Sequence, residues 1–232
     1  MGPFSAWVKK IFGSNNNKKE EPAGGQDPPL QDSKESQFKV VRVQPTPNPD
    51  AFQFIMNGPV IASGTKTFSS ADEAQGDPLG MALFEIFGVE NVFLRENFVT
   101  ITKSKVVGWH TVMEKLGDTI EDHLTFYPET GTAPGIPKDT HPILDKFKKE
   151  DFIHCSDIEK TQIIEALLDI AVRPALTNDG GGINILGIEG NVVKIHYQGA
   201  CGSCPSSTTG TLTYIENFLK EAIHPDIEVL AA

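Results

Sequence analysis

Cys201 and Cys204 form the only CxxC pair of the chain, in the run GACGSCPSS. A thiolate is both a nucleophile and a metal ligand, and this spacing is typical of metal-binding and redox sites. The small residues around the pair allow backbone amides to come close to the sulfur atoms. The run is expected between a strand that ends near Tyr197 and a helix that begins near Ser206, whose positive end favours negative charge. The sequence therefore predicts two readily ionised thiols that bind a metal or exchange disulfides.

The number of thiolates limits what the pair can hold. One CxxC supplies two ligands, whereas a four-iron cluster or a structural zinc ion usually takes four. Cys155 is a poor candidate for a further ligand, because no Cys, His or acidic residue forms a ligand pair with it. Two copies of the chain would supply four thiolates on a twofold axis. We expect a shared and exposed site, which suits release of a metal group better than electron transfer.

Two other functions could use the same pair: a thiol-disulfide oxidoreductase, and a zinc-binding interaction module. A thioredoxin-like motif would be followed by further strands and helices, whereas one helix and a short tail are expected after Cys204. The acidic residues form no close pair in a cleft motif, so hydrolase activity is not expected. His196 lies beside the cysteine run and is interpreted as a solvated strand residue rather than a ligand.

The pair lies in a C-terminal domain that is expected over 156–232. Ser156 and Glu159 have the form of a capping box that opens a helix. The segment Asp179-Gly180-Gly181 is interpreted as a turn that ends a helix, not as a site. A hairpin around the pair Gly190-Asn191, a last helix and an edge strand DIEVL complete a small sheet packed by two helices.

A second α+β domain is expected over 38–127. Strands are predicted in FKVVRV, AFQFIM and NVFLRENFVTITK, with the proline-rich PTPNP as a break between the first two. Helices are predicted in PLGMALFEIFGV, ending at Gly88, and from Asp118 to Tyr127. Residues 128–155 are rich in Pro, Gly and charge and predict a flexible linker. The fold class is therefore α+β, with two small domains that move independently.

The first 37 residues predict a disordered or weakly helical tail, because most of them are polar. Within residues 4–12, FSAWVKKIF, apolar side chains recur at helical spacing with two lysines between them. Such a segment is either a frayed tail or a helix that docks weakly to a membrane or a partner.

Composition excludes several classes of protein. The apolar fraction of 39% is adequate for soluble globular domains. The net charge of -11 leaves no basic surface for nucleic acid, which is not expected as a partner. Three cysteines make no disulfide framework, and no apolar run is long enough to span a bilayer. With no secretory signal pattern and no Arg before Arg42, we expect the bacterial cytoplasm, with the mitochondrial matrix as the alternative.

Two stretches of the sequence carry a family resemblance. The run RPALTNDGG, the hairpin and GACGSCPSST resemble the C-terminal domain of the NifU/Nfu family over about 158–230. The runs QPTPNPDAFQF, DPLGMALFEIFGVENVF and NFVTITK resemble the N-terminal domain of Nfu-type proteins over 38–127.

The resemblance implies an iron-sulfur cluster scaffold or carrier that catalyses no bond-making on a small substrate, so an enzyme is not expected. It implies a [4Fe-4S] cluster that bridges two subunits through Cys201 and Cys204 and passes to apo-proteins, with upstream cluster assembly machinery as a further partner. A [2Fe-2S] unit in a dimer is the alternative. Two positions depart from the family pattern: Gly182 replaces a common acidic residue, and Gln53 replaces a common Lys.

Overall fold

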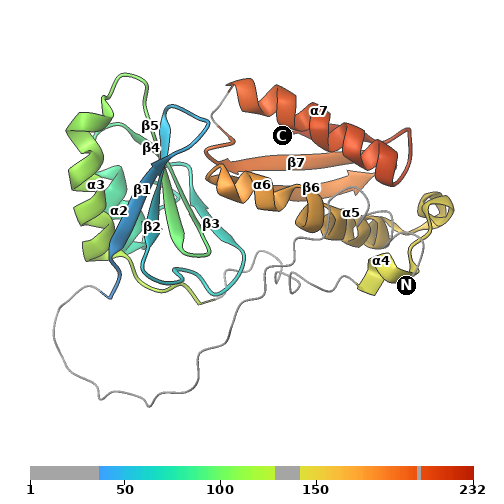
Figure 1. Ribbon diagram of the computed structural model, residues 1–232, viewed down its shortest axis with the longest axis horizontal. Helices are drawn as coiled ribbons and strands as arrows, with labels where there is room; N and C mark the ends of the chain where they lie inside the picture. Colours follow the sequence, from blue (N-terminus) through green and yellow to red (C-terminus); the bar gives the residue numbers. More distant parts are fainter. Residues whose placement is uncertain (1–36, 129–141, 203–204) are drawn as a thin grey trace, which may run out of the picture.

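The computed structural model describes residues 37–128, 142–202 and 205–232 (Figure 1). The expected docking helix at 4–12, all but the last residue of the tail, and Cys204 lie outside these ranges.

The N-terminal domain is built on a five-stranded antiparallel sheet in the order β1-β2-β5-β4-β3. Its strands are β1 (Val40–Pro45), β2 (Ala51–Met56), β3 (Thr65–Phe68), β4 (Val89–Arg95) and β5 (Phe98–Lys103). The three predicted strand segments are confirmed, the last of them as the β4-β5 hairpin. The edge strand β3 was not predicted, because its four residues TKTF show no apolar alternation.

Two helices cover one face of this sheet, α2 (Pro78–Phe84) and α3 (Trp109–His123) (Figure 1). Helix α2 begins at the cap residue Asp77, whose carboxylate accepts a hydrogen bond from the Gly80 amide at 2.8 Å. It ends at Phe84 and not at the predicted Gly88. Helix α3 begins nine residues before the predicted Asp118, and its C-terminal end lies at His123 instead of at residue 127.

The C-terminal domain has a three-stranded sheet with helices packed against it. Its elements are α4 (Pro142–Lys146), the 3-10 helix η1 (Lys149–His154), α5 (Asp157–Ala171), α6 (Arg173–Asn178), β6 (Gly181–Glu189), β7 (Val192–Gly199), α7 (Pro205–Ala222) and β8 (Glu228–Ala231). The capping box at Ser156 and Glu159 is confirmed, as is the hairpin of β6 and β7. The predicted edge strand is β8, which pairs with β7 in parallel.

The predicted linker over 128–155 differs from the structure in its second half. Residues 142–146 and 149–154 are helical, and Leu144, Phe147 and Phe152 are buried in the core of the C-terminal domain. Their apolar side chains are separated by charged residues, so the segment shows no clear period in the sequence although it packs.

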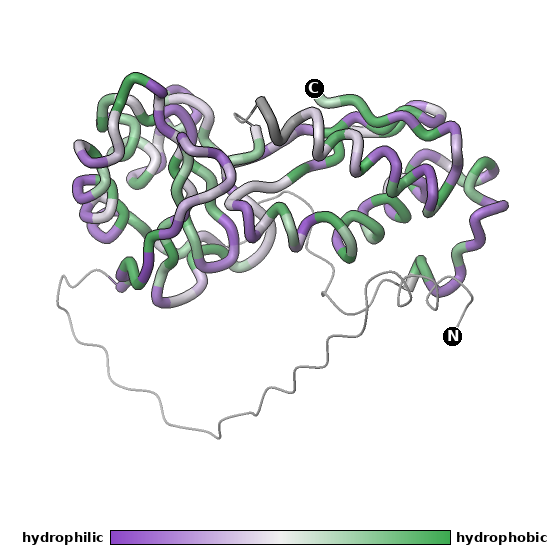
Figure 2. The backbone as a smooth tube through the Cα atoms, turned by 45° about the horizontal axis from the view of Figure 1, so that its top comes forward, coloured by the Kyte–Doolittle hydropathy of each residue, from purple (hydrophilic) through white to green (hydrophobic). Residues whose placement is uncertain are grey.

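Each domain has its own apolar core, and most of the described buried apolar residues fall into two separate clusters, one in each domain. The two domains are nevertheless in contact and lie side by side in both views (Figures 1 and 2). This contact was not predicted, since the linker indicated independent motion. None of the described helices is both long and apolar enough to cross a membrane.

Candidate functional site

Cys201 lies directly after β7, in a turn that brings it under the end of β6. Gly199 adopts a positive φ of 60°, which reverses the chain at this point. The Ala200 amide donates to the Gly180 carbonyl at 3.2 Å, and the Gly202 amide donates to the Gly199 carbonyl at 3.1 Å. The turn therefore holds Cys201 next to the turn that ends α6.

Because Gly181 has no side chain, the sulfur atom of Cys201 can pack directly against its backbone. A Cβ atom placed on Gly181 would lie 2.5 Å from Cys201 Sγ, 2.7 Å from the Gln198 carbonyl oxygen and 2.9 Å from the Cys201 nitrogen. Any side chain at position 181 would displace the thiol. The thiol of Cys201 thus sits in a cradle of backbone, and a thiolate is a donor that suits iron or zinc.

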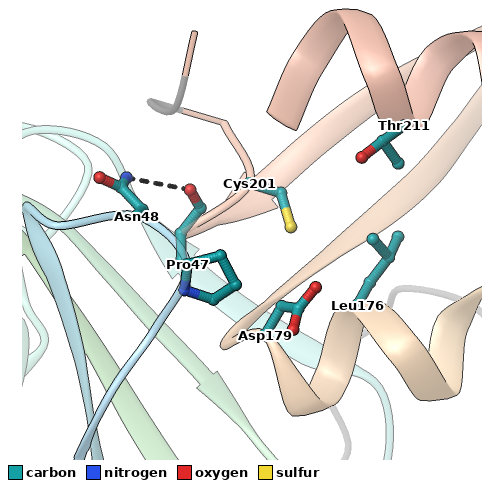
Figure 3. Close-up of a pocket in the computed structure, with 7 residues that line it drawn as sticks. Pro47, Asn48, Leu176, Asp179, Cys201 and Thr211 are labelled. Carbon is teal, nitrogen blue, oxygen red and sulfur yellow. Dashed lines mark hydrogen bonds between the residues drawn. The ribbon is translucent and has the colours of Figure 1, made fainter. Parts of the chain in front are cut away.

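A pocket surrounds Cys201, and its wall contains residues of both domains (Figure 3). The lining residues are Pro47, Asn48, Leu176, Asp179, Ala200, Cys201 and Thr211. The sulfur points toward Leu176 and Asp179, away from Asn48. Burial raises the pKa of the Asp179 carboxyl above its ordinary value. Burial, with the nearby charge of Cys201 as a second cause, raises the pKa of Tyr197 to about 12.

The thiol of Cys201 is buried, with 4% of the residue exposed. The sequence predicted an exposed site, so this expectation was wrong for the arrangement described here. The physical reason is that the turn folds inward over Gly181 and that Pro47 and Asn48 of the other domain cover one side.

Of the two other cysteines, the structure describes Cys155 but not Cys204. Cys204 lies outside the described residues, so its role as a ligand stays a prediction. Cys155 follows η1, and its Sγ donates to the Asp151 carbonyl at 3.4 Å. Burial, then the charges of Glu159 and Asp151, raise its thiol pKa. Within the described parts of the chain, no group of three or more Cys, His, Asp or Glu side chains could hold a metal ion.

The segment Asp179-Gly180-Gly181 forms the predicted turn, but it also belongs to the candidate site, since Asp179 lines the pocket and Gly181 contacts the thiol. Gly180 has a φ of 78° and its amide donates to the Thr177 carbonyl at 3.1 Å, which ends α6 as the turn interpretation required. His196 is exposed on β7, and its Nδ1 lies 3.1 Å from the carbonyl oxygen of Ala232.

Sequence reasoning missed the polar residues of the N-terminal domain that contact the cysteine turn. Asn48 Nδ2 donates to the Ala200 carbonyl at 3.1 Å (Figure 3). Gln53 Nε2 donates to the Thr177 carbonyl at 3.0 Å. The PTPNP run was interpreted only as a break between strands, and a partner more than a hundred residues away leaves no signal in local pattern.

Both departures from the family pattern lie at this contact. Gln53 is buried with 1% exposed, and a Cβ placed on Gly182 would lie 3.5 Å from Phe93 and 3.8 Å from an Arg95 guanidinium nitrogen.

Two sequence families match the two domains in order. The family described as "Scaffold protein Nfu/NifU N terminal" matches residues 41–126, and "NifU-like domain" matches residues 164–230. The chain belongs to the Nfu/NifU family. The N-terminal match covers the five-stranded sheet, and the NifU-like match covers the cysteine turn.

Relatives of this Nfu/NifU chain carry related names. It is 35% identical over 191 residues to "NFU1 iron-sulfur cluster scaffold homolog, mitochondrial" of Drosophila erecta. The matched region covers 81% of this chain and 62% of that relative. It is 34% identical over 181 residues to "NifU-like protein 4, mitochondrial" of Arabidopsis thaliana, with 77% and 61% covered. The chain thus spans about three fifths of the length of these relatives.

Solved structures add little at this level of similarity. The solution structure of a NifU-like protein from Saccharomyces cerevisiae is 18% identical to this chain, with a TM-score of 0.37. The match covers 49% of this chain and 100% of the chain in that structure.

The names of the relatives above include "mitochondrial", which gives no support to the predicted bacterial cytoplasm.

Proposed function

We propose that the protein is an iron-sulfur cluster scaffold and carrier. The observation that carries the proposal is the Cys201 thiol, held in a backbone cradle beside Gly181 within the NifU-like domain. The names of the Drosophila and Arabidopsis relatives point to the same class of function.

The cluster is the cargo of this protein, bound through Cys201 and Cys204. Two thiolates from each of two chains make the four ligands that a [4Fe-4S] cluster takes, which is why we propose a homodimer around it. A [2Fe-2S] unit shared in the same way is the alternative. The protein supplies no bond-making chemistry to a small substrate; it holds the cluster and gives it up.

Apo iron-sulfur proteins are the proposed recipients, and the cluster assembly machinery is the proposed source. For the compartment we propose the mitochondrial matrix, which the names of the relatives favour over the bacterial cytoplasm. A thiol-disulfide oxidoreductase remains the competing function, since the same thiols could serve it.

Anaerobic reconstitution of the full chain with iron and sulfide tests the proposal. We expect visible absorption from thiolate-to-iron bands and a dimer mass, with two cysteines of each chain bound. Cys201→Ser and Cys204→Ser should each abolish stable cluster binding. Cys155→Ser is the matched control and should leave it nearly intact.

Other outcomes decide against the carrier. A colourless monomer that reduces insulin disulfides would favour the oxidoreductase, and stoichiometric zinc without iron would favour the interaction module. Loss of the cluster in the Cys155→Ser variant alone would show that the ligands are assigned to the wrong residues.

A further inference from the structure

Among the described residues, three hydrogen bonds between side chains of the N-terminal domain and the C-terminal domain end close to Cys201. Beside the bonds from Asn48 to Ala200 and from Gln53 to Thr177, Thr65 Oγ1 donates to the Gln198 side-chain oxygen at 3.0 Å. Ala200, Thr177 and Gln198 belong to the two segments that form the cradle of the thiol, 177–182 and 198–201. The N-terminal domain therefore contacts the part of the C-terminal domain that carries the chemistry.

The bonds of Gln53 and Thr65 come from the face of the N-terminal sheet that α2 and α3 leave open, and Asn48 lies in the loop between β1 and β2. Gln53, Thr100 and Phe93 are direct neighbours across β2, β5 and β4, so their side chains share one face. All three are at most 1% exposed. They lie outside the apolar core of their own domain, and Phe93 is buried because the C-terminal domain lies against it.

The C-terminal domain meets this face with glycines. A Cβ on Gly199 would lie 2.8 Å from the Phe93 ring, and a Cβ on Gly180 would lie 2.9 Å from Thr46 Cγ2 and 3.0 Å from Gln53 Cγ. Both glycines have positive φ. Side chains of the N-terminal domain thus pack directly against the glycine backbone of the cysteine turn and of the turn that ends α6.

Docking also closes one side of the Cys201 pocket. Pro47 and Asn48 line the pocket from the N-terminal domain, and Ala200 beside the thiol is 2% exposed. A cluster shared between two chains requires Sγ of each Cys201 to face the other chain. The loop around Asn48 occupies the side of the pocket next to Ala200, so a second copy that approaches the thiol from that side must displace the loop.

The contact has the character of a separable interface. It joins two cores that remain distinct, and no ion pair found among the described residues crosses it. The Thr100 hydroxyl is buried at the contact, 3.2 Å from the Cβ position of Gly180, without a hydrogen-bond partner. An unpaired buried hydroxyl weakens an interface, and interfaces between domains of one chain commonly open.

We propose that the open face of the N-terminal sheet and a second copy of the chain compete for the surface around Cys201. The docked form is a closed monomer that protects the thiol, and the cluster-bridged dimer forms from the undocked chain. The competition rests on the proposed function, because the shared cluster is what brings the second copy to this surface.

Three threonines allow a test with one kind of substitution. Thr65 makes an interdomain hydrogen bond, and Thr100 has an unpaired hydroxyl at the contact. Thr65→Val removes a bond that holds the domains together. Thr100→Val removes a buried polar group that opposes docking. Thr111→Val is the matched control, because Thr111 is exposed at the start of α3, on the side of the sheet that the helices cover.

The readout is the rate at which iodoacetamide alkylates Cys201 in the full apo-chain, with the position assigned by fragment mass spectrometry. Thr65→Val should raise the rate roughly two- to tenfold, the effect of one lost hydrogen bond on the opening equilibrium. Thr100→Val should lower it by roughly twofold or more. Thr111→Val should leave it unchanged, and circular dichroism should show all three variants folded.

The same variants are then reconstituted with iron and sulfide. Faster dimer formation by Thr65→Val and slower formation by Thr100→Val are expected. If all folded variants alkylate at the wild-type rate, or if Cys201 of the wild type reacts as fast as in urea, the closed monomer is wrong. Alkylation uses no iron, so it tests the docking of the two domains independently of the cluster. A chain that shows the expected alkylation rates but forms no cluster would overturn the proposed carrier function. It would also overturn the competition with a second copy, whereas the docked arrangement of the domains would stand.

Discussion

The two faces of the N-terminal sheet are covered by different kinds of contact. On one face, Phe54 and Val99 pack against the helices in a continuous apolar core that includes Leu116. On the other face, Gln53 and Thr100 meet the C-terminal domain through hydrogen bonding and glycine backbone. Every residue of β5 is buried, so both faces are equally closed to water although only one is a core.

This difference indicates which contact is permanent. An apolar core is stabilised by burial in proportion to its area, and its loss unfolds the domain. The docked face gains a few hydrogen bonds, each with a modest net value, and it leaves buried hydroxyls unpaired, among them that of Thr100. The domain can therefore lose the second contact and remain folded.

The largest expected effect separates the two faces with one kind of substitution. Phe54 and Phe93 are both 0% exposed, Phe54 toward the helices and Phe93 toward the cysteine turn. Phe54→Ala should cost the N-terminal domain about 3–5 kcal/mol, as expected for a large core side chain. Phe93→Ala should cost that domain clearly less, because much of what it loses is contact with the other domain. Hydrogen exchange measured by mass spectrometry reports each domain separately, and equal losses would show that the two faces form one core.

A steric change at the docked face should have the next largest effect. Gly180 and Gly190 both have positive φ, so alanine at either position costs about 1–2 kcal/mol in the C-terminal domain. Only the Cβ of Gly180→Ala would also meet the N-terminal domain, at Thr46, Gln53 and Thr100; around Gly190 the space is open. Gly180→Ala should increase the radius of gyration of the full chain in small-angle scattering, and Gly190→Ala should not. An increase in both variants would attribute the change to backbone strain alone.

Local pattern predicted much of the architecture, because each predicted element has a short-range cause. The capping box at Ser156 and the turn at Gly190 confirm this for the C-terminal domain. The N-terminal end of α3 was missed, because its cap, Gly108, makes no side-chain hydrogen bond and the sequence gives no start signal there.

The candidate site was only partly readable from the sequence. The CxxC spacing identified Cys201, and its burial could not be foreseen, because the residues that cover it are distant in sequence. Gln53 and Thr100 have the composition of a solvated sheet face, but they are buried where Gly180 of the C-terminal domain lies against them. A local pattern contains no information about which face another domain will cover.

The helix-covered face can be examined with a pair of glycines. A Cβ on Gly80 of α2 would lie 2.9 Å from Ala74 Cβ, whereas Gly117 of α3 has open space around it. Gly80→Ala should overpack the core and destabilise the domain by about 1–3 kcal/mol. Gly117→Ala should stabilise it by about 0.5–1 kcal/mol, because alanine loses less entropy in a helix. Thermal unfolding measures both, and a loss of stability in Gly117→Ala would mean that the outer side of α3 is covered.

The smallest expected effect concerns a carboxylate on the helix-covered side. Glu121 of α3 accepts a hydrogen bond from the Val40 amide at 2.8 Å and one from Lys39 Nζ at 2.9 Å, which attaches β1 to the helix. The amide and then the lysine lower the pKa of Glu121 below its ordinary value of 4.5.

A lowered pKa in the folded state stabilises the domain fully above pH 4.5, and this contribution is lost as the pH falls through the lowered value. Glu121→Gln should therefore lower the melting temperature at neutral pH, and the difference from the wild type should shrink as the pH falls below 4.5. Glu114→Gln, on the exposed side of the same helix, is the control and should show little change at either pH. If the difference in Glu121→Gln persisted in acid, the carboxylate would attach β1 through its shape and not through its charge. The helix-covered face would then depend on packing alone, and the contrast with the hydrogen-bonded docked face would be sharper than the structure indicates.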